Sequence, residues 1–455
     1  MDVYVSSHGS QKGPFPLEQI RQMQQRHEIL PNDYVWYQGL PAWIPIAQLQ
    51  PDGSIGPPPL HQTASIKHGA AAAFDRVTGR IASIAGVEKI EGLHRKDFFS
   101  EVFKKRTDDE IEQLFTTGTK TTTPPLETID TRWPHPWLFF KAMIAAALLY
   151  AGFYIGAVQF GNYNFLPGLV LVGSFAIPLA TLIFFVEMNV PRNVSLYQVF
   201  KLVNAGGVIA LVATVFLSKW LMSQGFEPAA GKTLTGAMLV GVTEEAAKIT
   251  AVILFMRNKR FSWTLNGLLI GAAVGTGFAA FESAGYALWQ LLHSLTFGAV
   301  QPMLDLIKSI LARLPMTEEQ VKELIFDAVR RQYISGIEAM RVVMRLRALL
   351  APLGHVVWTA LAAAALWKVK GDQPFRLRML VDLRFLRVFL LVAACHAIWD
   401  LPPNLGVFVL LRYPLLGFVA WIVVLAYVQD GLKQIREAQE ASRALPRAQP
   451  QVSPT

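Results

Sequence analysis

From residue 137 onward the chain alternates between long apolar stretches and short polar connections. A helix needs about 20 mostly apolar residues to cross the hydrocarbon core of a bilayer, and each stretch is about that long. The pattern therefore predicts about eight transmembrane helices. Their expected positions are residues 137–157, 165–187, 199–222, 233–256, 263–290, 352–369, 384–402 and 407–428.

The charges of the connections agree with this count. Lysine and arginine collect in every second connection, at Arg192, Lys201, 257–260 and 368–387. Residues 157–164 and 401–406 contain neither. Because cytoplasmic loops carry the excess of basic residues, both termini are expected in the cytoplasm. Residues 291–350 are long and basic, and we expect this insertion to be helical and either extracytoplasmic or reentrant.

The composition supports a membrane protein. Of 455 residues 52% are hydrophobic and only 16% charged, whereas soluble domains carry about 25% charged residues. The net charge of +9 is explained by the basic loops and predicts no nucleic-acid partner. Cys395 is the single cysteine, which excludes an intrachain disulfide and a cysteine-based zinc cluster. The N-terminal sequence lacks the features of a secretory signal.

Residues 1–50 predict a small soluble α+β domain in the cytoplasm, with an amphipathic helix between aromatic-rich segments. Four aromatic residues are candidates either for the core or for a groove that binds an extended proline-rich peptide: Tyr4, Trp36, Tyr37 and Trp43. Because so short a domain needs large side chains to bury enough area, the core is the favoured interpretation for most of them.

This segment also resembles the bacterial GYF-like domain. The resemblance lies in the Gly13-Pro14-Phe15 turn, the Val35-Trp36 pair and Trp43. It implies a docking module for a proline-rich peptide. The proline-rich residues 51–59 that follow are either a linker or a ligand in cis.

Residues 51–133 are expected to be a linker. Within it, residues 93–115 predict a basic, phenylalanine-rich amphipathic helix, which lies at the membrane surface or packs on the cytosolic side of the bundle. Residues 431–455 are expected to be a disordered cytosolic tail. The fold class is thus a polytopic α-helical membrane protein, with the membrane domain at residues 134–430 and a small N-terminal α+β domain.

Ionisable residues interrupt the apolar stretches. They are Glu244, Glu245, Lys248, Glu282, His355, His396 and Asp400. Three charges near the centre of one helix would cost roughly 8–10 kcal/mol if they faced lipid. The groups must therefore face the interior of the bundle and meet one another. Lys248 is read as a counter-ion of Glu244, four residues away on the same helical face.

Carboxylates and imidazoles on separate helices can hold a zinc ion with an open position for water, and a further carboxylate can act as general base. The same residue types build the proton relay of a transporter or channel. The adjacent pair of glutamates favours the hydrolase, because neighbouring carboxylates raise the pKa of one of them. We expect the site in the outer half of the bilayer. Gly267, Gly271 and Gly275 predict close helix packing around it.

The order of these motifs resembles the PrsW family of intramembrane proteases, which are related to the CAAX prenyl proteases. The resemblance covers about residues 135–430 and rests on the acidic and imidazole motifs together with the stretch "FFVEMNVPRNVSLYQV". The motifs are Glu244-Glu245-x-x-Lys248, Phe278-x-x-x-Glu282, Gly354-His355 and His396-x-x-x-Asp400.

The resemblance implies an intramembrane metalloprotease that cleaves a membrane-anchored protein near the extracytoplasmic side of a bacterial cytoplasmic membrane. Glu244 would be the general base, and Glu245, His396 and Asp400 would complete the catalytic group. Glu282, His355 and His396 are implied as ligands of a divalent metal, expected to be zinc, and Lys248 and Phe278 as supporting residues. Hydrolysis without a metal is the alternative within this class. An inactive membrane-bound interaction protein is a further alternative to the protease.

Overall fold

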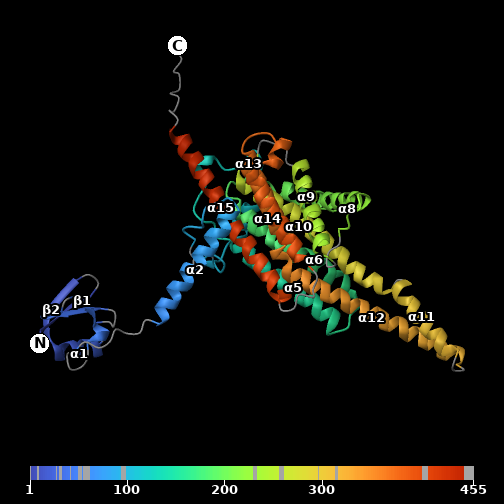
Figure 1. The fold of residues 1–455 in the computed structure, drawn as a ribbon, viewed down its shortest axis with the longest axis horizontal. Helices are drawn as coiled ribbons and strands as arrows, with labels where there is room; N and C mark the ends of the chain where they lie inside the picture. Colours follow the sequence, from blue (N-terminus) through green and yellow to red (C-terminus); the bar gives the residue numbers. More distant parts are fainter. Residues whose placement is uncertain are drawn as a thin grey trace, which may run out of the picture. The chain divides into compact units, whose positions relative to one another are not determined.

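A computed structural model of the chain describes residues 2–7, 10–26, 28–29, 33–40, 42–49, 54, 62–93, 99–228, 233–255, 261–295, 297–312, 316–401 and 408–444. The chain divides into two compact units, Met1–Arg76 and Val77–Thr455 (Figure 1). The proline-rich residues 51–59, apart from Ser54, and the basic connection 257–260 lie outside the described residues.

The N-terminal unit contains a four-stranded antiparallel sheet in the order β2-β1-β3-β4, as the α+β prediction requires. Its elements are β1 (Asp2–Ser7), β2 (Ser10–Pro16), α1 (Leu17–Gln25), β3 (Tyr34–Tyr37), β4 (Ile44–Pro45) and the 3-10 turn η1 (Ile46–Gln48). Val3, Val5 and Val35 alternate along β1 and β3 and pack with Ile20 of α1 in an aliphatic core. The small helix and sheet therefore share one apolar layer.

The favoured interpretation of the N-terminal aromatic residues as core is wrong for most of them. Side chains alternate between the two faces of a strand, so Tyr4 and Trp36, which pair across β1 and β3, lie opposite the aliphatic core. Their ring centroids are 6.0 Å apart. Trp43 is 37% exposed, and only Tyr37 packs against the core. The fully buried core residues are valines and isoleucines, and the rings of Tyr4 and Trp36 lie on the outer face of the sheet.

The second unit is a helical bundle. Its main helices are α5 (Trp137–Val158), α6 (Leu166–Met188), α7 (Leu196–Lys201), α8 (Gly207–Ser223), α9 (Leu234–Phe255), α10 (Thr264–Leu295), α11 (Phe297–Leu311), α12 (Glu318–Leu350), α13 (His355–Lys370), α14 (Leu383–Trp399) and α15 (Phe408–Ala444). Short helical turns lie at η2 (Leu126–Thr128), η3 (Tyr163–Phe165), η4 (Leu202–Gly206), η5 (Ala351–Leu353) and η6 (Leu377–Val381). Each predicted transmembrane stretch coincides with a helix.

Six helical segments of the described chain are long and apolar enough to cross a membrane. Two of the eight expected spans, α9 and α14, are not among them. Helix α9 carries two glutamates and a lysine, and α14 has only 17 residues. The fold is therefore that of a multi-pass membrane protein, and the two expected spans outside that set both carry ionisable residues of the sequence motifs.

The insertion 291–350 is helical, as expected. Helix α10 continues to Leu295, and α11 and α12 run side by side away from the bundle (Figure 1). The predicted helix at 93–115 is shorter than expected, because α4 covers only Asp108–Thr116, and residues 94–98 lie outside the described residues. Helix α2 (Gln62–Ile84) was not predicted.

The predicted disordered tail is also corrected by the structure. Helix α15 continues to Ala444, so residues 431–444 are helical, and residues 445–455 lie outside the described residues. Leu432 and Ile435 are buried on the inner face of this extension, and Gln439 donates to the carbonyls of Leu126 and Ile129. These contacts hold the polar end of α15 against the preceding linker.

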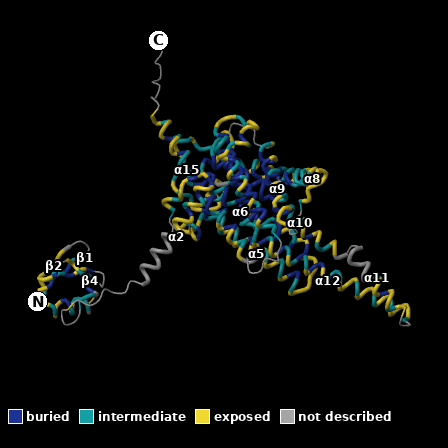
Figure 2. Tube along the Cα trace, viewed as in Figure 1, coloured by how far each residue is buried: buried dark blue, intermediate teal, exposed yellow. Residues whose placement is uncertain are grey.

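Helix α10 lies at the centre of the bundle, and its residues 264–280 are all buried. Buried residues gather around α6, α9 and α10 (Figure 2). The predicted glycine stripe of α10 packs on α13. A Cβ atom at Gly267 would lie 2.9 Å from Ala364 Cα, and one at Gly275 would lie 2.6 Å from the His355 carbonyl oxygen. The close helix packing expected from the stripe is thus confirmed.

We predict that Gly271→Ala destabilises the bundle, because the new Cβ would lie 2.3 Å from the Thr359 carbonyl oxygen. Backbone atoms must then move apart, at a cost of about 1–3 kcal/mol. Gly285→Ala on the same helix is the matched control, since a Cβ there meets no described atom within 4 Å. The midpoint of thermal unfolding in detergent should fall for Gly271→Ala only, and equal midpoints for the two variants would contradict the prediction.

Candidate active site

The acidic pair of α9 is held by a buried lysine. Lys248 Nζ donates to Glu245 Oε1 at 2.7 Å and lies 3.5 Å from Glu244 Oε2. The side chains of Lys248 and Glu245 are fully buried, and that of Glu244 is nearly so. One turn of helix brings the three groups to one face, as the sequence predicts. The lysine lies closer to Glu245 than to Glu244, its predicted partner.

His396 of α14 joins the same cluster from a second helix. Its Nδ1 lies 2.8 Å from Glu245 Oε1, and its Nε2 lies 3.6 Å from Glu244 Oε2. Asp400, one turn later at the end of α14, places Oδ2 3.4 Å from the same Nε2. The imidazole thus faces three carboxylates, to which a ring nitrogen can donate when it carries a hydrogen.

His355 is the first residue of α13 and contributes the second imidazole. Its Nδ1 lies 2.9 Å from Lys248 Nζ, and its Nε2 lies 3.1 Å from Glu282 Oε2 on α10. The ring centroids of His355 and His396 are 5.0 Å apart. Four helices therefore meet at these side chains, and all the ionisable residues singled out in the sequence are brought together.

Aromatic rings separate the cluster from the surrounding bundle. The ring of Phe278 lies 4.2 Å from Lys248 Nζ and 5.2 Å from the His355 ring. Trp358 is fully buried and packs against both imidazoles, with its centroid 4.9 Å from His396 and 5.5 Å from His355. This apolar wall lowers the local dielectric constant and strengthens the electrostatic interactions inside it.

The donor set fits a divalent metal ion. Glu244, His355 and His396 each offer a ligand atom, and these atoms all lie within 4.8 Å of one another. Buried Glu244 Oε2 and Glu245 Oε2 have no hydrogen-bond partner among the described residues. Since buried polar atoms are nearly always paired, these two oxygens are suited to accept from a water or to coordinate an ion. Zinc accepts both carboxylate oxygen and imidazole nitrogen.

Glu282 is not one of these three residues. Its carboxylate accepts from Arg347 of α12 and faces His355 Nε2. Sequence reasoning missed Arg347, because the insertion 291–350 was treated as separate from the site. The one sequence feature that could have drawn attention to it is a basic residue eight positions before His355, at the end of the insertion. Trp358, three residues after His355, was also missed.

The stretch after the second span has a structural role. The Glu187 carboxylate accepts from the backbone N–H groups of Leu138 and Phe139 at 2.9 and 2.8 Å, at the start of α5. Asn266 of α10 is hydrogen-bonded to Asn189 and Asn193 from this stretch. Asn266 precedes Glu282 by 16 residues, or about 24 Å along α10, so the motif is remote from the acidic cluster.

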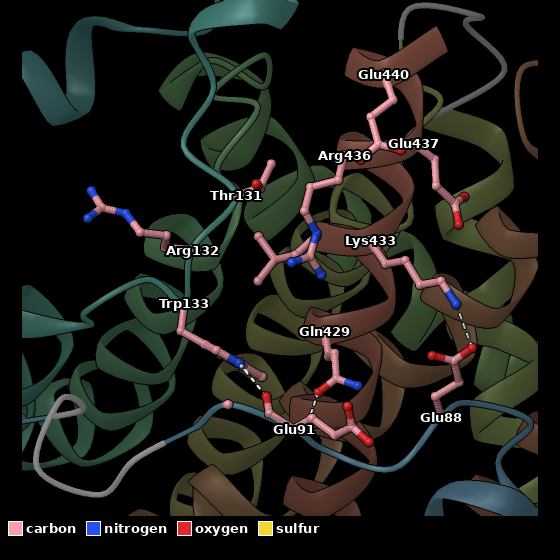
Figure 3. Close-up of a pocket in the computed structure, with 12 residues that line it drawn as sticks. Glu88, Glu91, Thr131, Arg132, Trp133, Gln429, Lys433, Arg436, Glu437 and Glu440 are labelled. Atoms are coloured by element: carbon pink, nitrogen blue, oxygen red, sulfur yellow. Dashed lines mark hydrogen bonds and ion pairs between the residues drawn. The ribbon is translucent and has the colours of Figure 1, made fainter.

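A cavity of about 720 Å³ opens at a different place. It lies between residues 88–92, residues 131–133 and the end of α15, where Lys433 pairs with Glu88 and Gln429 accepts from the Glu91 backbone N–H (Figure 3). Tyr427 donates to the Ala85 carbonyl nearby. These contacts dock the predicted linker on the bundle. Neither His355 nor His396 lines this cavity, so the volume of a cavity does not identify the candidate active site in this bundle.

Comparisons with known proteins identify both units. Residues 195–428 match the family model described as PrsW family intramembrane metalloprotease, and residues 4–50 match GYF domain 2. The first match covers more than half of the chain and includes every residue of the acidic and imidazole cluster. No curated protein and no solved structure matches the chain.

Removal of the buried cation tests the role of Lys248. Lys248→Met leaves two neighbouring carboxylates without their shared partner, and we expect a loss of about 3–5 kcal/mol in the free energy of unfolding. Adding Glu245→Gln should restore part of this loss, because it removes one buried charge. Lys219→Met, at an exposed position of α8, is the control. Unfolding in mixed micelles measures all four proteins, and an unchanged Lys248→Met would refute the counter-ion role.

Proposed function

Because the chain belongs to the PrsW family of intramembrane metalloproteases, we propose that it hydrolyses a peptide bond of a membrane-anchored protein at the Glu244–His355–His396 cluster. The observation that carries this proposal is the convergence of these side chains, with ligand atoms within 4.8 Å of one another, inside an apolar bundle. A peptidase of this kind needs an activated water and a group that takes up its proton.

Glu244 is the proposed general base. Its Oε2 is buried without a hydrogen bond among the described residues and lies 3.6 Å from His396 Nε2. A carboxylate has two oxygens, so Glu244 can offer one to an ion and keep the other for the proton of a water molecule. Lys248 offsets part of the negative charge and thereby stabilises the ionised pair.

Glu245 and Asp400 are proposed to orient His396. Glu245 Oε1 lies 2.8 Å from Nδ1, and Asp400 Oδ2 lies 3.4 Å from Nε2. A carboxylate that accepts from Nδ1–H leaves Nε2 directed toward Glu244 and the interior of the cluster. His396 can then act there as a ligand or, when protonated, as a donor to the developing oxyanion.

The family description implies a divalent metal, and we propose that it is zinc. Glu244, His355 and His396 would hold it. A bound ion would lower the pKa of a coordinated water and polarise the carbonyl of the scissile bond. The residues of the chain supply the remaining parts of the reaction, which are the base at Glu244, the orientation of His396 and the exclusion of bulk water by Phe278 and Trp358.

We also propose that the site opens on the extracytoplasmic side of a bacterial cytoplasmic membrane, with both termini in the cytoplasm. The distribution of basic loops supports this orientation. Glu282, Asp400 and Arg347 retain partial exposure, with side chains 14%, 19% and 26% accessible, and mark the open end of the cluster. In this proposal the cluster is reached from the end of α10 at which the insertion begins.

The N-terminal unit is proposed to bind a proline-rich peptide on the outer face of its sheet. Tyr4, Tyr34 and Trp36 occupy alternate positions of β1 and β3 on that face, and Tyr34 is 48% exposed. Aromatic grooves recognise proline-rich segments because these are already extended and lose little entropy on binding. Such a module would bring a substrate or a regulator to the protease.

Loss of the base and of the imidazole tests the proteolytic function. Glu244→Gln and His396→Ala should each lower cleavage of a co-expressed single-span substrate by at least about 10²-fold, the usual contribution of a general base. Glu323→Gln, at an exposed position of α12, is the matched control and should cleave normally. Immunoblotting of the substrate follows the reaction. Normal cleavage by Glu244→Gln would favour a transporter or an interaction protein over a protease.

The side on which the site opens is tested by cysteine labelling in a Cys395→Ala background. We expect Glu282→Cys to react with a small membrane-impermeant thiosulfonate added outside spheroplasts. Glu440→Cys, near the end of α15, should react only after the membrane is opened. Mass-tag gel shifts measure both reactions. Labelling of Glu282→Cys from the cytoplasmic side alone would reverse the proposed orientation.

A further inference from the structure

The side chain of Arg347 connects the insertion helix α12 to the active site. Arg347 Nη2 donates to Glu282, and its Nε donates to Ser283 Oγ at 2.8 Å. The guanidinium also lies 4.5 Å from the centroid of the Tyr286 ring. All three partners belong to α10, so the guanidinium is fixed in orientation as well as in position.

The carboxylate that Arg347 holds also contacts His355. Glu282 Oε2 lies 3.1 Å from His355 Nε2, while His355 Nδ1 lies 2.9 Å from Lys248 Nζ. A protonated lysine can only donate, so Nδ1 must accept and carries no hydrogen. The ring hydrogen is therefore on Nε2 and is donated to Glu282. The two contacts together select one tautomer of the imidazole.

In this tautomer the lone pair of the ring is on Nδ1, the nitrogen that could ligate a metal ion. With Nε2–H bound to Glu282, Nδ1 keeps the lone pair of the ring, which accepts from Lys248 at the centre of the cluster. A metal ion bound to Nδ1 would take the place of this contact. A histidine that ligates a metal commonly gives its other N–H to a carboxylate, which fixes the ring and raises its basicity. Glu282 fits this supporting position, and its contact with Arg347 keeps it there.

We propose that Arg347 is a positioning residue of the active site, which acts through Glu282 to hold His355 in its ligating tautomer and orientation. This assignment rests on the proposed function, because it gives His355 a metal to bind. It also makes the insertion part of the catalytic domain. Without Arg347 the Glu282 carboxylate loses its partner on α12 and can turn away from Nε2.

The experiment uses the full-length protein in detergent. Zinc affinity is measured by competition with a chromophoric chelator, and cleavage by kcat and KM for a single-span substrate. Arg347→Met should weaken zinc binding by about 10-fold or more, the usual effect of losing such a support, and should lower kcat more than KM rises. Arg347→Lys keeps the charge but not the planar fork, so it should fold and show a smaller loss of affinity.

The matched control is Arg341→Met. Arg341 lies on the same helix and bonds Glu338 and Tyr154 of α5 without touching Glu282. The Arg341→Met change removes an α12 contact of similar kind, and zinc affinity and kcat should stay unchanged. If Arg347 acts through Glu282, the double variant Arg347→Met/Glu282→Gln should bind zinc no more weakly than Glu282→Gln alone.

Three results would overturn the proposal. One is wild-type zinc affinity and kcat in Arg347→Met, and another is an equal loss in Arg341→Met, which would show a general packing role. The third is strict additivity of the Arg347 and Glu282 changes. In each case the wild-type protein still binds zinc and cleaves, so the proposed function stands. A wild-type protein that does neither would overturn both proposals together.

Discussion

The acidic and imidazole cluster depends on the buried ammonium group of Lys248. Lys248 contacts Glu245 on its own helix and His355 on α13, and it lies near Glu244. His396 of α14 joins the same carboxylates. None of these groups could face lipid without a large cost, and each is offset by a partner. The charge of Lys248 thus determines how α9, α13 and α14 meet. The apolar side chains pack around that arrangement.

Small residues make this meeting possible. A Cβ atom at Gly241 would lie 2.8 Å from the Ala393 carbonyl oxygen and 3.4 Å from His396 Cβ, so α9 and α14 approach one turn before the acidic pair. Gly275 has the same role beside the His355 carbonyl. Glycine at these points shortens the distance between helix axes, which brings short carboxylates and imidazoles within reach of one another. The same glycines that allow close helix packing therefore also bring the acidic and imidazole groups together.

The features that the sequence could predict are those set by local geometry. Apolar length located the helices, and a spacing of four residues placed Glu244 and Lys248 on one face. The finer pairing of Lys248 with Glu245 depends on where His396 sits, which only the tertiary structure decides. Arg347 was missed for the same reason, because spacing along the chain does not show that α12 docks on α10. Long-range contacts of this kind carry no periodic signal.

Two polar clusters in the same bundle differ in whether all their buried side-chain atoms are hydrogen-bonded. Asn266 bonds both Asn189 and Asn193, and none of their side-chain atoms is left buried and unpaired among the described residues. Such a closed network holds helices and has nothing left to bind. Glu244 and Glu245 are also buried, yet the Oε2 atom of each has no hydrogen-bond partner among the described residues. An oxygen without a hydrogen-bond partner can still accept from a water or coordinate an ion, and the proposed hydrolysis within the membrane requires such a group.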